Sequence, residues 1–263
     1  MNFRSALVGG LSAFTLAASA VASVSFSGSY TQSFDGLFNS GSTTLTGRGP
    51  FSLDGDVGGG LVSTGMAGWT GANFDGSSGN TEVRAQNGSQ SGSAGRGVVS
   101  FGQTGSTERA LGALPTGNQI NQFGVTFSNT SGSTITQLEI SFYGEQWRAG
   151  DAGVSNTLSF FYGLGGALSS ATTSFTALDF SSLNTAGGNA ALDGNEAANR
   201  QLRSATITGL NWSSGDTLTL RWNMNEVSGQ DTGLAIDDFS MAIPTPGAVA
   251  LLGLAGLTAR RRN

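Results

Sequence analysis

Apolar side chains alternate with polar ones, at a period of two residues, in several separate stretches of this 263-residue chain. Such alternation is typical of half-buried β-strands, because successive side chains of a strand point to opposite sides. Glycine, asparagine and serine separate the stretches, as in strands joined by turns. The apolar positions are Phe123, Val125 and Phe127; Leu138, Ile140 and Phe142; Leu158, Phe160 and Tyr162; Leu218, Leu220 and Trp222; and those of a last strand at 234–243. The pattern predicts an all-β fold, an antiparallel β-sandwich.

The composition agrees with short strands joined by turns, and it restricts the chemistry. The chain has 42 Gly, only 11% charged residues, no Cys and no His, and all its basic residues are Arg. Without imidazole or thiolate, histidine- or cysteine-based catalysis and the usual zinc sites are excluded. Without disulfides, an extracellular domain must be stabilised by its core or by a hard cation bound through oxygen atoms.

Two stretches interrupt the strand pattern. Residues 86–97 are rich in Gly and Ser, and we expect a long surface loop there rather than a linker between two domains, because the preceding segment shows no core of its own. Residues 187–203 lack alternation and are expected to form a loop with at most one helical turn. The sequence therefore predicts a single domain over residues 23–243.

The first 22 residues have the organisation of a secretory signal peptide. Arg4 supplies the positive start, residues 7–18 are apolar, and small residues at Ala20 and Ala22 match a cleavage site. We expect signal peptidase to act after Ala22 and the protein to be exported.

The last 20 residues, 244–263, predict a transient membrane insertion. The apolar run at 248–259 is shorter than the roughly 20 residues of a spanning helix, and an arginine cluster follows it. Basic residues remain cytoplasmic, so before processing the cluster would lie inside the cell and the domain outside. Pro244 and Pro246 favour an extended segment ahead of the helix, which a protease could grip.

This C-terminal arrangement resembles the PEP-CTERM sorting signal of Gram-negative bacteria. The residues that carry the resemblance are Pro244, Thr245 and Pro246, the apolar run, and Arg260, Arg261 and Arg262. Members of the family usually have Pro-Glu-Pro where this chain has Pro-Thr-Pro. The resemblance implies processing by an exosortase and delivery to the cell surface or the exopolysaccharide matrix. An uncleaved, single-pass envelope protein is the alternative.

The domain itself resembles a recurrent, uncharacterised domain of PEP-CTERM and other bacterial surface proteins. The stretches that carry the resemblance are 105–117, 123–148, 191–200, 220–223 and 231–242. Its closing IDDF is also similar to jelly-roll modules such as lectin-like, MAM and carbohydrate-binding domains. We expect a jelly-roll sandwich without enzymatic function, in a structural or adhesive role that includes carbohydrate binding. The alternative is a carboxylate-dependent polysaccharide hydrolase.

Asp237 and Asp238 interrupt the apolar last strand. Adjacent side chains of a strand point to opposite faces, so one carboxylate should face inward, where an unpaired charge is costly. Either a cation or a network of backbone and arginine groups must then compensate it. In the jelly rolls that the chain resembles, an Asp at this place and an acidic residue of the first strand hold a structural calcium ion. The resemblance implies Asp35, with Asp237 and Asp238, as the corresponding ligands.

Glu145, Trp147 and Arg148 lie at the end of a strongly patterned strand. One interpretation is an exposed ligand rim, in which the aromatic ring stacks on a sugar between polar groups. The other is a core Trp with a Glu–Arg pair that holds a loop in place.

The charge balance argues against nucleic acid as a partner. Removal of both ends leaves eight arginines against 17 acidic residues, a net charge of −9. Binding to phosphate requires a basic face, which such a domain does not offer.

Deletion of residues 244–263 is expected to release the protein in soluble, secreted form, because the tail contains the membrane stop that we predict. Immunoblotting of medium and envelope fractions measures the distribution, with the full chain as the control. Unchanged retention of the truncated protein in the envelope would contradict the sorting prediction.

Overall fold

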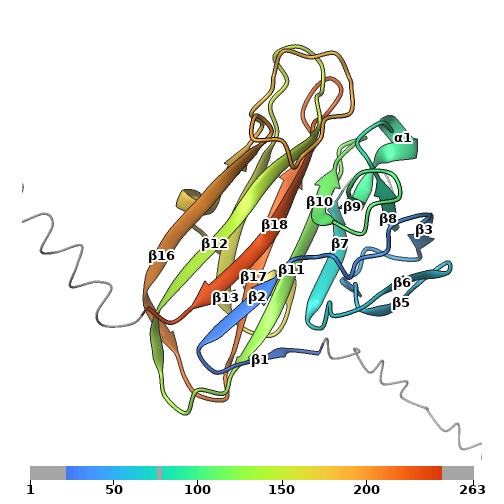
Figure 1. Ribbon diagram of the computed structural model, residues 1–263. Coiled ribbons are helices and arrows are strands. Elements are labelled where there is room, and N and C mark those ends of the chain that lie inside the picture. The colour runs from blue at the N-terminus through green and yellow to red at the C-terminus, as the bar shows by residue number, and fades with distance from the viewer. Residues whose placement is uncertain (1–21, 76–78, 245–263) are drawn as a thin grey trace, which may run out of the picture.

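The alternating stretches form the strands of two large sheets that lie face to face (Figure 1). The computed structural model describes residues 22–75 and 79–244. Residues 1–21 of the predicted signal peptide, Thr245, Pro246 and the arginine cluster lie outside this range, which begins at Ala22 and ends at Pro244. The prediction of an antiparallel β-sandwich is confirmed, and among the described strands only two pairings, β1 with β11 and β8 with β9, are parallel.

The first sheet, sheet A, contains most of the strands predicted from the second half of the chain. Its main order is β14-β13-β17-β11-β7-β4, with β1 beside β11 and β15 beside β13. The bounds are β1 Val24–Phe26, β4 Phe51–Ser52, β7 Trp69–Asp75, β11 Ile120–Asn129, β13 Thr157–Leu164, β14 Thr173–Ser174, β15 Phe180–Ser181 and β17 Thr217–Asn225.

The second sheet, sheet B, has the order β16-β12-β18-β10-β9-β8-β3, with β2 beside β18. The bounds are β2 Ser29–Gln32, β3 Ser42–Leu45, β8 Thr81–Gln86, β9 Gly97–Phe101, β10 Ala110–Leu114, β12 Ile135–Arg148, β16 Arg200–Trp212 and β18 Gly233–Ala242. The remaining elements are the hairpin β5 Gly55–Gly58 and β6 Leu61–Ser63, the single helical turn α1 Gly92–Gly95, and the 3-10 turns η1 Leu168–Ser170 and η2 Thr176–Leu178.

The predicted loop at 187–203 is too long by its last four residues. Residues 200–203 begin β16, a 13-residue strand at the edge of sheet B. Most of its side chains are exposed or half-buried, so a strand forms here without the regular apolar alternation that would reveal it. The predicted loop at 86–97 begins on the last residue of β8 and ends on the first residue of β9, and between them it contains the helical turn α1. Within the part of the chain that the structure describes, no helix is long and apolar enough to cross a membrane.

Trp222 occupies the centre of the core between the two sheets. Five aromatic rings surround it, with centroids 5.1–5.9 Å from its own. Three come from sheet A and two from sheet B: Trp69, Phe123 and Phe160, and Phe142 and Phe239. Edge-to-face and stacked aromatic pairs add to the hydrophobic stabilisation of the sandwich. The alternation predicted for β11, β12 and β17 is confirmed at this core, because the apolar side chains expected to be buried there are 0% exposed: Phe123, Val125, Phe127, Leu138, Ile140, Phe142, Leu218, Leu220 and Trp222.

Replacement of Trp222 by Ala is expected to lower the free energy of unfolding by about 3–5 kcal/mol, because it empties the centre of the aromatic core. Trp222→Phe should cost much less, since Phe refills most of the space and removes a buried indole N–H that has no hydrogen-bond partner. Phe74→Ala, at a side chain that is 57% exposed, is the control. Urea denaturation measures all three, and equal losses for Trp222→Ala and Phe74→Ala would contradict the assignment.

Candidate metal centre

One extra residue in β18 sets the direction of the two adjacent aspartates. Opposite the single residue Phe142 of β12, β18 has two residues, Asp238 and Phe239. Such a β-bulge shifts the alternation of the strand by one residue. Asp238 has a φ of +49°, a left-handed conformation that Asp adopts more readily than most residues.

The bulge directs Asp237 to the outer face of sheet B. Ile236 and Phe239 are both buried in the core between the sheets although they are three residues apart. Asp237 therefore points away from that core, yet it is only 5% exposed because loops cover it. The side chain of Asp238 is 56% exposed. One of the two carboxylates is buried, as expected, but the prediction that it faces inward is wrong, because the bulge turns Asp237 to the outer face, where loops cover it.

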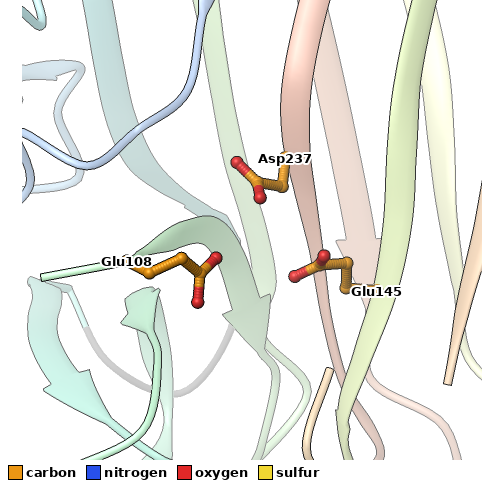
Figure 2. Close-up of side chains that lie close together, drawn as sticks. All are labelled: Glu108, Glu145 and Asp237. Atoms are coloured by element: carbon orange, nitrogen blue, oxygen red, sulfur yellow. The ribbon is translucent and has the colours of Figure 1, made fainter. Parts of the chain in front are cut away.

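Three carboxylates meet beneath these loops (Figure 2). Glu145 extends from β12 and Asp237 from the neighbouring strand β18, while Glu108 comes from the connection between β9 and β10. One oxygen of each lies within 4.8 Å of those of the other two. Figure 2 shows the side chains pointing toward a common centre. We call these three residues the carboxylate trio.

The hydrogen bonds of the trio leave two buried oxygens unused. Trp147 donates its indole N–H to Oε2 of Glu145 over 3.0 Å, and Asn195 donates Nδ2–H to Oε2 of Glu108 over 2.5 Å. Oδ1 of Asp237 accepts the backbone N–H of Asp238 over 2.7 Å. Among the described residues, Oε1 of Glu108 and Oε1 of Glu145 are buried and have no hydrogen-bond donor, although Oε1 of Glu145 forms an ion pair with Nη2 of Arg200 at 3.4 Å. A buried oxygen without a donor is costly, so these atoms favour a ligand that supplies positive charge.

The carboxylate trio is short of positive charge. Nη2 of Arg200 lies 3.4 Å from Glu145 Oε1 and 3.4 Å from Asp238 Oδ2, and its guanidinium stacks over the Tyr143 ring at 3.9 Å. One arginine shared with a further carboxylate cannot neutralise the two buried acids, Glu145 and Asp237, together with the half-buried Glu108 at these distances.

The pKa values of the buried carboxyls reflect this shortage. Burial raises the pKa of Glu145 to about 8, against the lowering effects of Arg200 and of the hydrogen bond from Trp147. Burial, together with repulsion from Glu145, also raises the pKa of Asp237 to about 8. Both carboxyls therefore tend to stay protonated at neutral pH unless a cation replaces the protons.

The geometry of the trio fits a hard divalent cation. Calcium binds six to eight oxygen atoms at about 2.3–2.6 Å, so ligand atoms on opposite sides of it are roughly 5 Å apart. Three carboxylates, each able to bind through one or two oxygens, offer half or more of such a shell. Magnesium requires shorter bonds and stricter octahedral geometry, and zinc prefers nitrogen and sulfur ligands. The carboxylate trio could thus hold a hard metal ion.

The structure brings only one of the three residues expected as calcium ligands into the trio. Asp238 points outward to Arg200, because the bulge at this residue turns its side chain away from the trio. Asp35 has an exposed side chain, and its Oδ1 accepts the backbone N–H of Arg109 over 3.3 Å. Asp35 therefore contacts the residue next to Glu108 instead of joining the cluster itself.

The interpretation of Glu145, Trp147 and Arg148 as an exposed ligand rim is wrong, because all three are at most 2% exposed. Trp147 stacks on Phe101 at 6.1 Å in a second, smaller apolar cluster on the outer face of sheet B. Arg148 donates a hydrogen bond to the carbonyl of Gly88 over 3.0 Å. The alternative of a core Trp is confirmed, although the arginine that pairs with Glu145 is Arg200 and not Arg148.

Sequence reasoning missed Glu108 and gave Glu145 another role. Glu108 lies in an irregular connection, where no periodicity indicates the direction of a side chain. Glu145 carried a usable signal, since an acidic residue within a long buried strand requires a partner just as Asp237 does.

No family model and no curated protein matches the chain. Among solved structures, it is similar to the K3 adhesin domain of Lys-gingipain from Porphyromonas gingivalis W83, with 12% identity and a TM-score of 0.38 over 67% of this chain and 91% of that one. It is also similar to TmCBM61, solved in complex with β-1,4-galactotriose, with 12% identity and a TM-score of 0.29 over 59% and 86%. The match to the enzymatically active domain of tailspike protein 4 from bacteriophage CBA120 has 9% identity and a TM-score of 0.36, over 68% of this chain but only 20% of that one. Likenesses at this level carry no argument about ligand or activity.

In metal-free buffer, the melting temperature is expected to fall as the pH rises from 6.5 to 8.5. Over this range the carboxyls of the unfolded chain are already ionised, whereas those of Glu145 and Asp237, with a raised folded pKa, still hold protons at 6.5 and lose them by 8.5. Asp231, whose pKa burial raises to about 6, acts in the same direction at lower pH and is therefore avoided.

Differential scanning calorimetry of wild type, Asp237→Asn and Asp238→Asn tests this expectation. The first variant should show a weaker pH dependence, and the second, at the exposed neighbour, should behave like wild type. A melting temperature that rises over this range in wild type would contradict the protonated state.

Proposed function

We propose that this protein is a non-enzymatic, exported surface or matrix protein whose β-sandwich is stabilised by one calcium ion bound to Glu108, Glu145 and Asp237. The observation that carries the proposal is the carboxylate trio, with two buried oxygens that lack any hydrogen bond. Because the chain has no cysteines, disulfides cannot stabilise its fold, and a bound cation can take their place. The ion would join the β9–β10 connection to the two central strands β12 and β18.

A structural or adhesive role, with carbohydrate binding, follows from this proposal. The trio lies beneath loops on one face of sheet B, so calcium would fix the surface loops rather than the core between the sheets. Rigid loops lower the entropy lost when a ligand binds. Calcium therefore supports a binding surface without taking part in a reaction.

Sorting to the envelope is a further part of the proposal, and the sequence arguments for the two chain ends support it. The exported form would meet millimolar calcium outside the cell, a concentration at which even weak extracellular calcium sites are filled. Exosortase processing and exopolysaccharide as a neighbouring partner follow from the resemblance of the tail.

The burial of the trio argues against the polysaccharide hydrolase. Two closely spaced carboxylates, one with a raised pKa, are what a glycosidase requires. However, Glu145 is fully buried, Asp237 is 5% exposed, and neither lines the clefts that the described residues form beside β8 and β9, beside β2 and β18, or beside Tyr143, so a glycosidic bond has no access to Glu145 and Asp237. Release of reducing ends from a polysaccharide, lost on Glu145→Gln, would instead establish the hydrolase.

Calcium is expected to raise the melting temperature of the chelator-treated protein. At a concentration about 100 times the Kd, binding adds about 2.7 kcal/mol, which corresponds to roughly 5–10 °C for a domain of this size. Asp237→Asn and Glu145→Gln should lose most of the shift, because each removes one charged ligand while keeping the side-chain shape.

Asp238→Asn is the matched control, since it makes the same chemical change one residue away at an exposed site. Calorimetric titration in buffers of different ionisation enthalpy should also show protons released as calcium binds. A wild type that does not respond to calcium, or an Asp238→Asn variant that loses the response equally, would overturn the assignment.

A further inference from the structure

A cleft of about 300 Å³, with both polar and apolar surface, lies beside the carboxylate trio, at the β8 and β9 side of sheet B. Three segments of the chain enclose it: the β2–β3 connection, the end of β8 with the loop that follows, and the β9–β10 connection. Its volume is at the lower end of the range for small-molecule sites, which suits a single sugar ring.

Neutral polar groups dominate the lining of the cleft. Asn39, Gln86, Asn87 and Gln90 contribute amides, and Thr104 contributes a hydroxyl. Each amide can both donate and accept hydrogen bonds, as the neighbouring hydroxyls of a sugar require. The described residues that line the cleft include no Asp or Glu, although the chain as a whole is acidic.

Arg109 is the one charged residue of this lining, and it is only 1% exposed. Its Nε donates to Ser100 Oγ over 2.9 Å, and its Nη2 donates to the Ser100 carbonyl. No carboxylate lies within 4 Å of its guanidinium among the described residues. Gly102 leaves the space that the guanidinium fills, since a Cβ at that position would overlap Nη1. A buried guanidinium that bonds only neutral groups favours an anion beside it.

Gln86 adds a complementary acceptor. Its Nε2 donates to the Gly95 carbonyl over 2.7 Å, while its buried Oε1 has no hydrogen bond. Gln86 is 8% exposed and borders the cleft. Among the described residues, Arg109 thus has no carboxylate partner and Gln86 Oε1 has no hydrogen-bond donor. A ligand with both an anionic group and hydroxyls would complement the two side chains.

We propose that this cleft binds a hexuronate residue of an acidic polysaccharide, with its carboxylate directed to Arg109 and a ring hydroxyl to Gln86 Oε1. The proposal deepens the carbohydrate-binding role proposed above and rests on it. The charge of the adjacent Glu108 acts on Arg109, but among the described residues the two form no direct ion pair, because the Glu108 carboxylate points to the trio (Figure 2). Glu108 would then bind the calcium ion on one side of the β9–β10 connection, and Arg109 would bind the hexuronate carboxylate on the other.

Isothermal titration of the full-length secreted protein with tri-galacturonate, against the neutral tri-galactose, tests the proposal. Wild type should prefer the acidic trisaccharide by about tenfold, the value of one favourable charged contact. Arg109→Gln should remove the preference. Thr104→Glu, at an exposed position on the rim, should weaken tri-galacturonate binding by about tenfold without affecting the fold. Thr206→Glu on β16, at the opposite edge of sheet B, makes the same charge change and should have no effect.

The possible outcomes distinguish the hexuronate site in the cleft from the carbohydrate-binding role proposed above. Tri-galacturonate binding that Thr104→Glu leaves unchanged would overturn the cleft as the site, while the carbohydrate-binding role would stand. A preference of wild type for the neutral sugar would likewise overturn the hexuronate assignment alone. Absence of binding to both trisaccharides and to a broad glycan array would overturn both proposals.

Discussion

The bulge at Asp238 is the constraint on which the rest of the site depends. A regular β18 would place Ile236 and Phe239 on opposite faces, and one of them would leave the aromatic core around Trp222. The extra residue lets both apolar side chains enter the core and turns Asp237 to the outer face. The same bulge thus allows the core to pack and places Asp237 in the carboxylate trio.

The position of Asp237 explains its surroundings. On the outer face it lies beside Glu145 of the neighbouring strand, and the β9–β10 connection that covers both brings Glu108. The loop between β15 and β16 contributes Asn195, which donates to Glu108. Acidic groups are thus concentrated where loops exclude water, which raises the free energy of their ionised forms. A bound cation offsets that cost and at the same time connects the loops to the sheet.

The outer face of sheet B therefore differs in character from the core between the sheets. The core is aromatic and needs no ligand, whereas the outer face combines a small apolar cluster around Trp147 with buried charges of both signs. Glu108 and Arg109, adjacent in the sequence, direct opposite charges into separate environments. Buried charges require a partner group or a ligand that compensates them, so we expect ligands to bind on the outer face of sheet B.

The sequence by itself determined the fold class, most strands of the second half of the chain and the chemistry that is excluded. Strand periodicity is a local property, so positions such as Phe123, Leu138 and Leu220 could be assigned to a buried face without any tertiary information. It also indicated that one of two adjacent aspartates would be buried, because adjacency in a strand is again local. Only the tertiary structure decided which face that was, since the bulge arises from the packing of Ile236 and Phe239 against distant strands. It also decided the partners Glu108 and Glu145, and the burial of Trp147, because loops far away in the sequence supply the cover and no local pattern records their positions.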